Sequence, residues 1–240
     1  SGGYFPVGGS SKIAESILPI IRSTGGNALV KAEVSQVIIS NNIATGVNMH
    51  DGKSITSDIV ISGTGIINTF NQLIPNEIKL KYQIDKQLNK IKPSAAHISL
   101  YIGLKGTPEA LKLPKANYWI YPEDVTHDEA FENYLKDTNS PFPVVYISFP
   151  SAKDPDWSNR YPDKSTIDII TLMPYSVFEK WEELEWKKRG EEYEKMKQQF
   201  SERLLEALFK QEPHLRNSID CYELSTPITT KHFMNYDKGE

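Results

Sequence analysis

The sequence has few of the features that mark redox-thiol proteins, zinc proteins or membrane-spanning proteins. Its 240 residues include a single cysteine, Cys221, which excludes an internal disulfide, a CxxC redox pair and a thiolate zinc site. No apolar run reaches the roughly 18 residues that a spanning helix needs. No basic and then apolar leader precedes Gly2 and Gly3.

Positive charge is also scarce relative to what a nucleic-acid-binding protein requires. The chain carries 27 Lys and Arg residues against 31 Asp and Glu residues, a formal net charge of −4. It has no block of like charges that could neutralise a row of phosphates. We therefore predict no nucleic-acid partner.

Clustered metal ligands and a nucleophile motif are missing as well. No histidine is three or four residues from another, so a histidine-built zinc site is not expected; the five are His50, His97, His127, His214 and His232. His97 lies in an apolar strand pattern, which favours a hydrogen-bonded core histidine. No serine stands in a GxSxG elbow, so a hydrolase triad has no starting point. We predict no metal site.

The first quarter of the chain has the pattern of one helix and a β-meander. A glycine turn at Gly8 and Gly9 precedes a helix expected from Ser10 or Ser11 to Gly25, in which Pro19 should cause a kink or an early end. Short strands are predicted at 28–31, 34–40, 43–50, 53–56 and 58–62, the last entering a bend at 63–65 where the backbone can approach a ligand.

The rest of the chain alternates longer strands and helices. Strands are predicted at 95–104, 118–121, 144–149, 166–173 and 218–225, and helices at 66–73, 81–90, 128–136, 177–188 and 191–210. We predict an α+β fold: a mixed β-sheet with flanking helices, joined to a partial α/β unit made of the meander and the first helix.

Two segments could carry chemistry. The turn Gly8-Gly9-Ser10 ahead of a helix presents backbone donors suited to an anion such as a pyrophosphate, although an ordinary helix cap explains it too. Residues 149–157 are rich in proline and aromatics. They form either a turn with Trp157 over the core or a rim loop over an apolar ligand.

Several motifs together resemble a known family. They are the stretch 2–10, Gly25-Gly26, the segment 30–34, Asp58–Ser62, Phe149–Pro155 with Trp157 and Arg160, and Thr226–Thr230. The chain resembles the interior of a flavin-dependent oxidoreductase of the phytoene desaturase and carotenoid isomerase superfamily, closest to its retinol saturase branch. It lacks an initiating Met and stops at Glu240 without a capping element, so we expect an internal fragment.

The resemblance implies a domain division and site residues. Residues 1–65 and 226–240 would belong to the FAD-binding domain, and 66–225 to the substrate domain. The implied FAD contacts are Val34, Gly8, Gly9, Ser62 and Gly63, and Tyr118, Phe149 and Trp157 are candidates for the substrate pocket. No catalytic residue of the family maps onto this stretch; Lys153 and Asp154 are candidates from motif and charge alone.

The expected function follows from the family. We expect FAD-dependent reduction of a C=C bond in an apolar polyene or retinoid, of the all-trans-retinol to 13,14-dihydroretinol type, with NAD or NADP as electron source. Carotenoid cis-trans isomerisation or desaturation is one alternative, and a non-catalytic module for apolar ligands or protein interaction is another. The resemblance implies a dinucleotide-binding fold with a GxGxxG motif ahead of this region. Without that fold, these 240 residues should not hold FAD tightly.

The resemblance also bears on location. The substrate class implies membrane association, at the endoplasmic reticulum for an animal protein and cytoplasmic or peripheral to the membrane for a bacterial one. The oligomeric state is left open.

Overall fold

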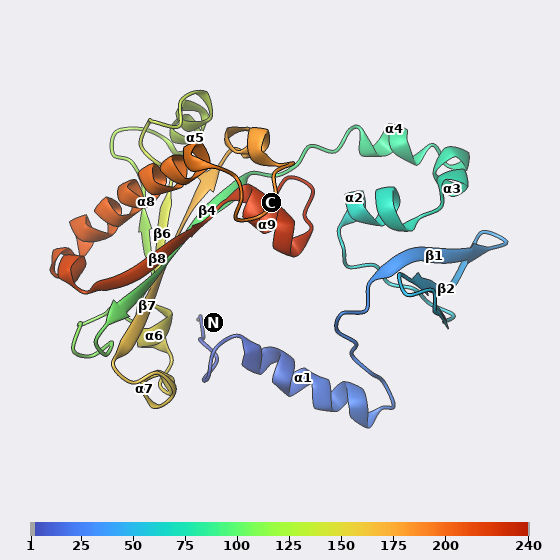
Figure 1. Ribbon diagram of the computed structural model, residues 1–240, viewed down its shortest axis with the longest axis horizontal. Helices are drawn as coiled ribbons and strands as arrows, with labels where there is room; N and C mark the ends of the chain where they lie inside the picture. Colours follow the sequence, from blue (N-terminus) through green and yellow to red (C-terminus); the bar gives the residue numbers. More distant parts are fainter. Residues whose placement is uncertain (1–2, 240) are drawn as a thin grey trace.

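The computed structural model describes residues 3–239 and arranges them in two parts (Figure 1). A small sheet with short helices forms one part, and a larger sheet covered by a long helix forms the other. Gly2 of the opening motif, and Ser1 and Glu240 at the outer limits of the proposed domains, lie outside the described residues.

The first part contains the predicted helix and meander. Helix α1 (Ser11–Ser23) follows the glycine turn, and β1 (Val34–Ser40), β2 (Ile43–Met49) and β3 (Ser54–Thr56) pair antiparallel in that order. Pro19 lies inside α1 without ending it. Residues 28–31 and 58–62 are not strands, and the side chains of Ile59 and Ile61 are exposed.

Four short helical segments lead from this sheet to the larger part. They are α2 (Ile66–Asn68), the π-helical turn η1 (Thr69–Leu73), α3 (Asn76–Lys81) and α4 (Ile84–Leu88). The single helix predicted at 81–90 is not formed. Gln83 adopts a left-handed conformation with φ of 52°, which ends one helical segment before α4 begins.

The larger part is built on a five-stranded sheet in the order β5-β6-β7-β4-β8. Its strands are β4 (Ala96–Lys105), β5 (Tyr118–Ile120), β6 (Val145–Ser148), β7 (Lys164–Met173) and β8 (Ile219–Ser225). Every adjacent pair is antiparallel, so the prediction of a mixed sheet is wrong. Strands β7 and β8 do point the same way, but β4 lies between them and pairs antiparallel with both.

One face of this sheet is buried beneath the long helix α8 (Glu191–Gln211). Side chains alternate along β4 and β7, and those facing α8, including Ile98, Leu100 and Ile169, are fully buried. From α8, Leu204 and Leu208 pack against them and form part of the apolar face of this helix.

The remaining helices lie in the connections between the strands and after the last strand. They are α5 (His127–Lys136), α6 (Pro150–Lys153), α7 (Trp157–Arg160), η4 (Pro213–Asn217) and α9 (Pro227–Met234). The long helix predicted at 177–188 is replaced by two 3₁₀ turns, η2 (Tyr175–Val177) and η3 (Glu179–Trp181). Phe178 and Trp181 in this stretch are buried in the core, with ring centroids 6.0 Å apart.

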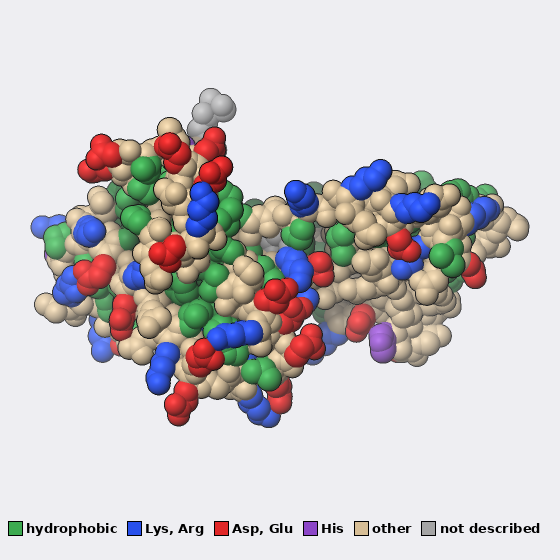
Figure 2. Space-filling view, turned by 90° about the horizontal axis from the view of Figure 1, so that it is seen from above, with side chains coloured by type: hydrophobic (Ala, Val, Ile, Leu, Met, Phe, Trp, Pro, Cys, Tyr) green, Lys and Arg blue, Asp and Glu red, His purple; other side chains and the backbone are tan. Residues whose placement is uncertain are grey.

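The surface carries both signs of charge. On the face displayed in Figure 2, basic and acidic side chains are interspersed and neither sign dominates. Within residues 3–239, no helix is long and apolar enough to cross a bilayer.

The burial pattern predicts unequal effects of two truncations. Leu204→Ala should lower the free energy of unfolding by about 2–5 kcal/mol, because Leu204 is fully buried between α8 and the sheet. Ile17→Ala is the control, since α1 buries none of its residues, and should cost less than about 0.5 kcal/mol. Urea unfolding of both variants measures the difference; equal losses would contradict the assignment of the core.

Candidate functional site

The second face of the large sheet, opposite α8, gathers polar and aromatic side chains. Its central row consists of Ser148 on β6, Asp168 on β7 and Tyr101 on β4, which the strand register places side by side. In the neighbouring row, Trp119 packs on Tyr146 with ring centroids 4.7 Å apart. The two rows give this face a polar centre bordered by flat apolar surface.

A lysine and an aspartate with perturbed ionisation meet in the polar row. Lys153, at the end of α6, donates from Nζ to Ser148 Oγ at 2.8 Å and to Asn117 Oδ1. Burial lowers the pKa of Lys153, against the opposing charge of Asp168. Burial likewise raises the pKa of Asp168, which the charge of Lys153 only partly offsets. A carboxyl group that holds its proton closer to neutral pH suits proton transfer.

Asp168 was missed by the sequence interpretation, which considered only Lys153 and Asp154. The available signal was a lone acidic residue in the middle of the alternating strand at 164–173. An acid at such a position must face either solvent or a polar site. The strand pattern alone does not say which neighbours it meets, because those come from β4 and β6.

Asp154 has a different role from Lys153, although the two are adjacent. Its carboxylate is almost fully buried and accepts hydrogen bonds at 3.0 Å from the backbone amides of Gly8 and Asp156. It also forms an ion pair with Arg160. Burial opposes its ionisation, but these hydrogen bonds and the charge of Arg160 prevail and lower its pKa. Asp154 thus ties the N-terminal glycine turn to the larger part and stays ionised.

Of the three predicted pocket residues, the structure brings Tyr118 and Phe149 into direct contact. Phe149 is fully buried, with Tyr118 edge-on to its ring at a centroid distance of 5.3 Å. The Tyr118 hydroxyl donates to Glu212 Oε1 at 2.5 Å, and burial first, then Glu212, raises its pKa to about 12. Trp157 donates from Nε1 to the carbonyl of Lys164 at 2.7 Å. Their roles in a pocket stay predictions.

The candidate cofactor contacts lie in loops and on a sheet edge. Val34 begins β1, an edge strand whose outer backbone groups are not paired by β2. Gly9 and Gly63 have open space where a Cβ would stand, so a ligand could approach their backbone. Ser62 shares hydrogen bonds with Thr64 and Thr69. This donor set fits a dinucleotide bound largely through the main chain.

The amides of both turn glycines are already engaged. Gly8 donates to Asp154 and Gly9 to the Pro6 carbonyl, and both have a φ of 89°, which a residue with a side chain rarely adopts. Gly8 therefore holds the turn together through the same N–H that a cofactor phosphate would need. Among the described residues, no group of three metal-ligating side chains is assembled.

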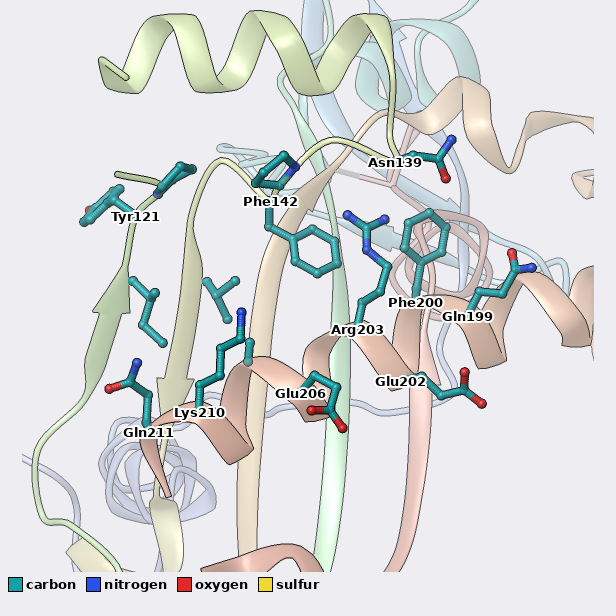
Figure 3. A pocket seen from close by; sticks show the side chains of 15 residues that line it. Tyr121, Asn139, Phe142, Gln199, Phe200, Glu202, Arg203, Glu206, Lys210 and Gln211 are labelled. Carbon is teal, nitrogen blue, oxygen red and sulfur yellow. The ribbon is translucent and has the colours of Figure 1, made fainter. Parts of the chain in front are cut away.

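A separate hollow of about 820 Å³ lies on the α8 side of the molecule (Figure 3). It is bordered by α8 and the loop at 139–142, and Arg203 points from α8 toward that loop. Arg203 donates to the carbonyls of Thr138 and Ser140 at 2.6 and 2.7 Å and covers the ring of Phe142. Arg203 therefore anchors this loop to α8, and its position in the hollow is accounted for by these contacts with the loop.

Comparison with known proteins gives a consistent set of relatives. No protein-family model matches the chain. The chain is 34% identical over its whole length to an all-trans-retinol 13,14-reductase of Danio rerio, and 33% identical over 99% of its length to the human one. It is 29% identical over 98% of its length to a chloroplastic prolycopene isomerase of Arabidopsis thaliana. These relatives confirm the predicted resemblance.

Solved structures share the fold at lower identity. An oxidoreductase from Methanosarcina mazei matches 91% of the chain with a TM-score of 0.56 and 18% identity, and a protein from Pyrococcus furiosus matches 91% with 0.55 and 17%. The chain spans about 41% of the length of the zebrafish reductase and 42% of the archaeal oxidoreductase.

The buried carboxylate of Asp154 predicts acid-sensitive stability. Its lowered pKa stabilises the fold above the ordinary value of 3.8, and that contribution is lost as the pH falls through the lowered pKa. Asp154→Asn should therefore cost about 1.5–3 kcal/mol at pH 7 and progressively less in acid. Urea unfolding between pH 7 and 2 tests this. The more exposed Asp156 is the control, and Asp156→Asn should cost less than about 1 kcal/mol.

Asp168 should behave in the opposite way. Because its pKa is raised, ionising Asp168 in the folded protein lowers the free energy of unfolding. This loss is fully present above the raised pKa and absent below the ordinary value of 3.8. Asp168→Asn should therefore raise the free energy of unfolding at pH 8 and leave it unchanged at pH 3. Asp220→Asn, on the partly exposed ion pair with Lys105, is the control for charge removal. Equal stabilities of wild type and Asp168→Asn at pH 8 would refute the assignment.

Proposed function

We propose that the chain is the substrate-domain-containing part of an FAD-dependent oxidoreductase that reduces one C=C bond of a polyene alcohol, of the all-trans-retinol to 13,14-dihydroretinol type. The observation that carries the proposal is the similarity, over the whole chain, to all-trans-retinol 13,14-reductases of fish and mammals. Residues 66–225 form the substrate domain in this proposal, and 1–65 and 226–240 belong to the FAD-binding domain.

The second face of the large sheet offers the groups that such a substrate requires. Trp119, Tyr146 and the aliphatic Ile170 provide apolar surface along which a polyene can lie. Asp168, whose pKa is raised by burial, and Lys153, whose pKa is lowered by burial, lie beside that surface. When bound, reduced FAD supplies the hydride that saturates the double bond. The chain's own contribution is to orient the polyene, exclude water and position a proton donor.

Two observations support placing residues 1–65 in an FAD-binding domain. The backbone groups at Val34, Gly9 and Gly63 are accessible to a dinucleotide. Helix α1 is amphipathic but buries none of its residues, and Ile59 and Ile61 are also exposed, as expected of surfaces that pack on further protein. The proposal includes NAD or NADP as the electron source. It also includes a membrane-associated location, because the substrate class is apolar.

Carotenoid cis-trans isomerisation is the second candidate. It is favoured by the similarity to prolycopene isomerases from Arabidopsis thaliana and Oncidium, which extends over 98% of the chain. The same apolar surface would accept a longer polyene, and an isomerase needs no net reduction of its substrate.

The reaction can be tested on the full-length protein that contains this chain. It should purify with flavin absorbance and convert all-trans-retinol to a dihydroretinol, while a poly-cis carotene offered in parallel stays unchanged. Isomerisation of the carotene without reduction of retinol would favour the second candidate. Absence of flavin would contradict both.

The same assay tests the proton-holding role of Asp168. Asp168→Asn should lower kcat by about 10²–10⁴-fold while flavin content stays equal to wild type. Asp220→Asn, which removes a carboxylate from exposed β8, should keep wild-type kcat. An unchanged kcat in Asp168→Asn would place the proton donor elsewhere.

A further inference from the structure

A second cleft adjoins the polar row, with which it shares Tyr101, and lies between the start of α8, strand β8 and helix α9. Its volume is about 970 Å³, within the range of small-molecule sites. Trp186, Phe233 and Met234 line it, and all three are substantially exposed although apolar. Such a hollow favours a ligand with an extended apolar portion.

Arg189 lines the same cleft and is 6% exposed. Its Nη1 donates to the Tyr193 hydroxyl at 3.2 Å and its Nη2 makes a long contact with the Ile228 carbonyl at 3.5 Å. Its Nε is buried and has no hydrogen-bond partner. Within the described part of the chain, no carboxylate lies within ion-pair distance of this guanidinium.

The carboxylates at the cleft do not serve as its counter-ions. Glu223 and Glu194 both line the cleft, but each faces Lys197, with which it forms an ion pair. Lys187, the remaining cation of the cleft, lies over the ring of Trp186 at 4.5 Å. Among the described residues, the buried positive charge of Arg189 therefore has no anionic partner.

A buried charge without a partner is costly, so such groups in proteins are usually paired. Arg203 provides an internal comparison, because its guanidinium meets two backbone carbonyls at 2.6 and 2.7 Å and is less buried. Arg189 has a neutral hydroxyl, one long contact and the ring face of Tyr193 at 5.2 Å, but no anionic partner. A planar guanidinium with spare donors matches a carboxylate in both charge and shape.

We infer that this cleft binds a single-chain amphiphile of the fatty-acid class, with Arg189 as the counter-ion of its carboxylate and Trp186, Phe233 and Met234 around its chain. One positive charge without an anionic partner balances one carboxylate, whereas a phosphate monoester would bring up to two negative charges. The inference does not depend on the proposed reaction, since it requires neither flavin nor turnover.

Binding of cis-parinaric acid to the full-length protein that contains this chain tests the site, because this polyene fatty acid fluoresces when it enters an apolar cavity. Wild type should bind the acid about tenfold or more tightly than its methyl ester, which has the same chain and no charge. The acid, and not the ester, should also raise the Tm. Equal affinities for acid and ester in wild type would overturn the inference without any variant.

Substitutions then locate the charge. Arg189→Gln should remove the preference for the acid and leave the ester affinity unchanged, and Arg189→Lys should restore part of it. Lys187→Gln, at the same cleft, and Arg203→Gln, on the α8 side, are the matched controls and should keep the preference. A preference that survives in Arg189→Gln, or disappears in either control, would contradict the role of Arg189. Flavin content and retinol reduction are measured separately, so failure here leaves the proposed function standing.

Discussion

The ten-residue antiparallel register between β4 and β7 is the constraint on which the rest of the structure depends. Because side chains alternate along paired strands, this register fixes two faces at once. It sends Ile98, Leu100 and Ile169 beneath α8, and it sends Tyr101 and Asp168 to the opposite face. A shift by one residue would bury Asp168 in the apolar core and expose the isoleucines, so packing and chemistry are specified together.

The charged groups around this sheet are of two kinds. Some are fully paired and stabilise the fold, whereas others are removed from solvent without full pairing. Asp154 is satisfied by two amides and an arginine, which makes it a joint between the N-terminal turn and the larger part. Asp168 is half-buried and Arg189 is buried, and both have weaker compensation. Since a fold gains nothing from poorly compensated charges, these two positions are where ligands and chemistry are expected.

Local sequence patterns predicted many of the helices and strands, but they did not predict how distant strands pair. Helices α1, α5 and α8 and the strands of both sheets follow from periodicity and turn residues. The antiparallel order does not, because it depends on β4 inserting between β7 and β8, which no local pattern encodes. In the site, Lys153 was found from its motif, whereas Asp168 required its neighbours across the sheet. Arg189 gave no sequence signal, since its lack of a counter-ion is a property of the packed structure.

The central claim is that the second face of the large sheet holds the polyene. Photo-crosslinking of the full-length protein with a diazirine-bearing retinoid, followed by peptide mapping, tests it most directly. The account predicts labels on β5, β6 and β7 around Trp119, Tyr146 and Ile170, suppressed by excess retinol. Labels confined to the hollow between α8 and residues 139–142 would contradict it.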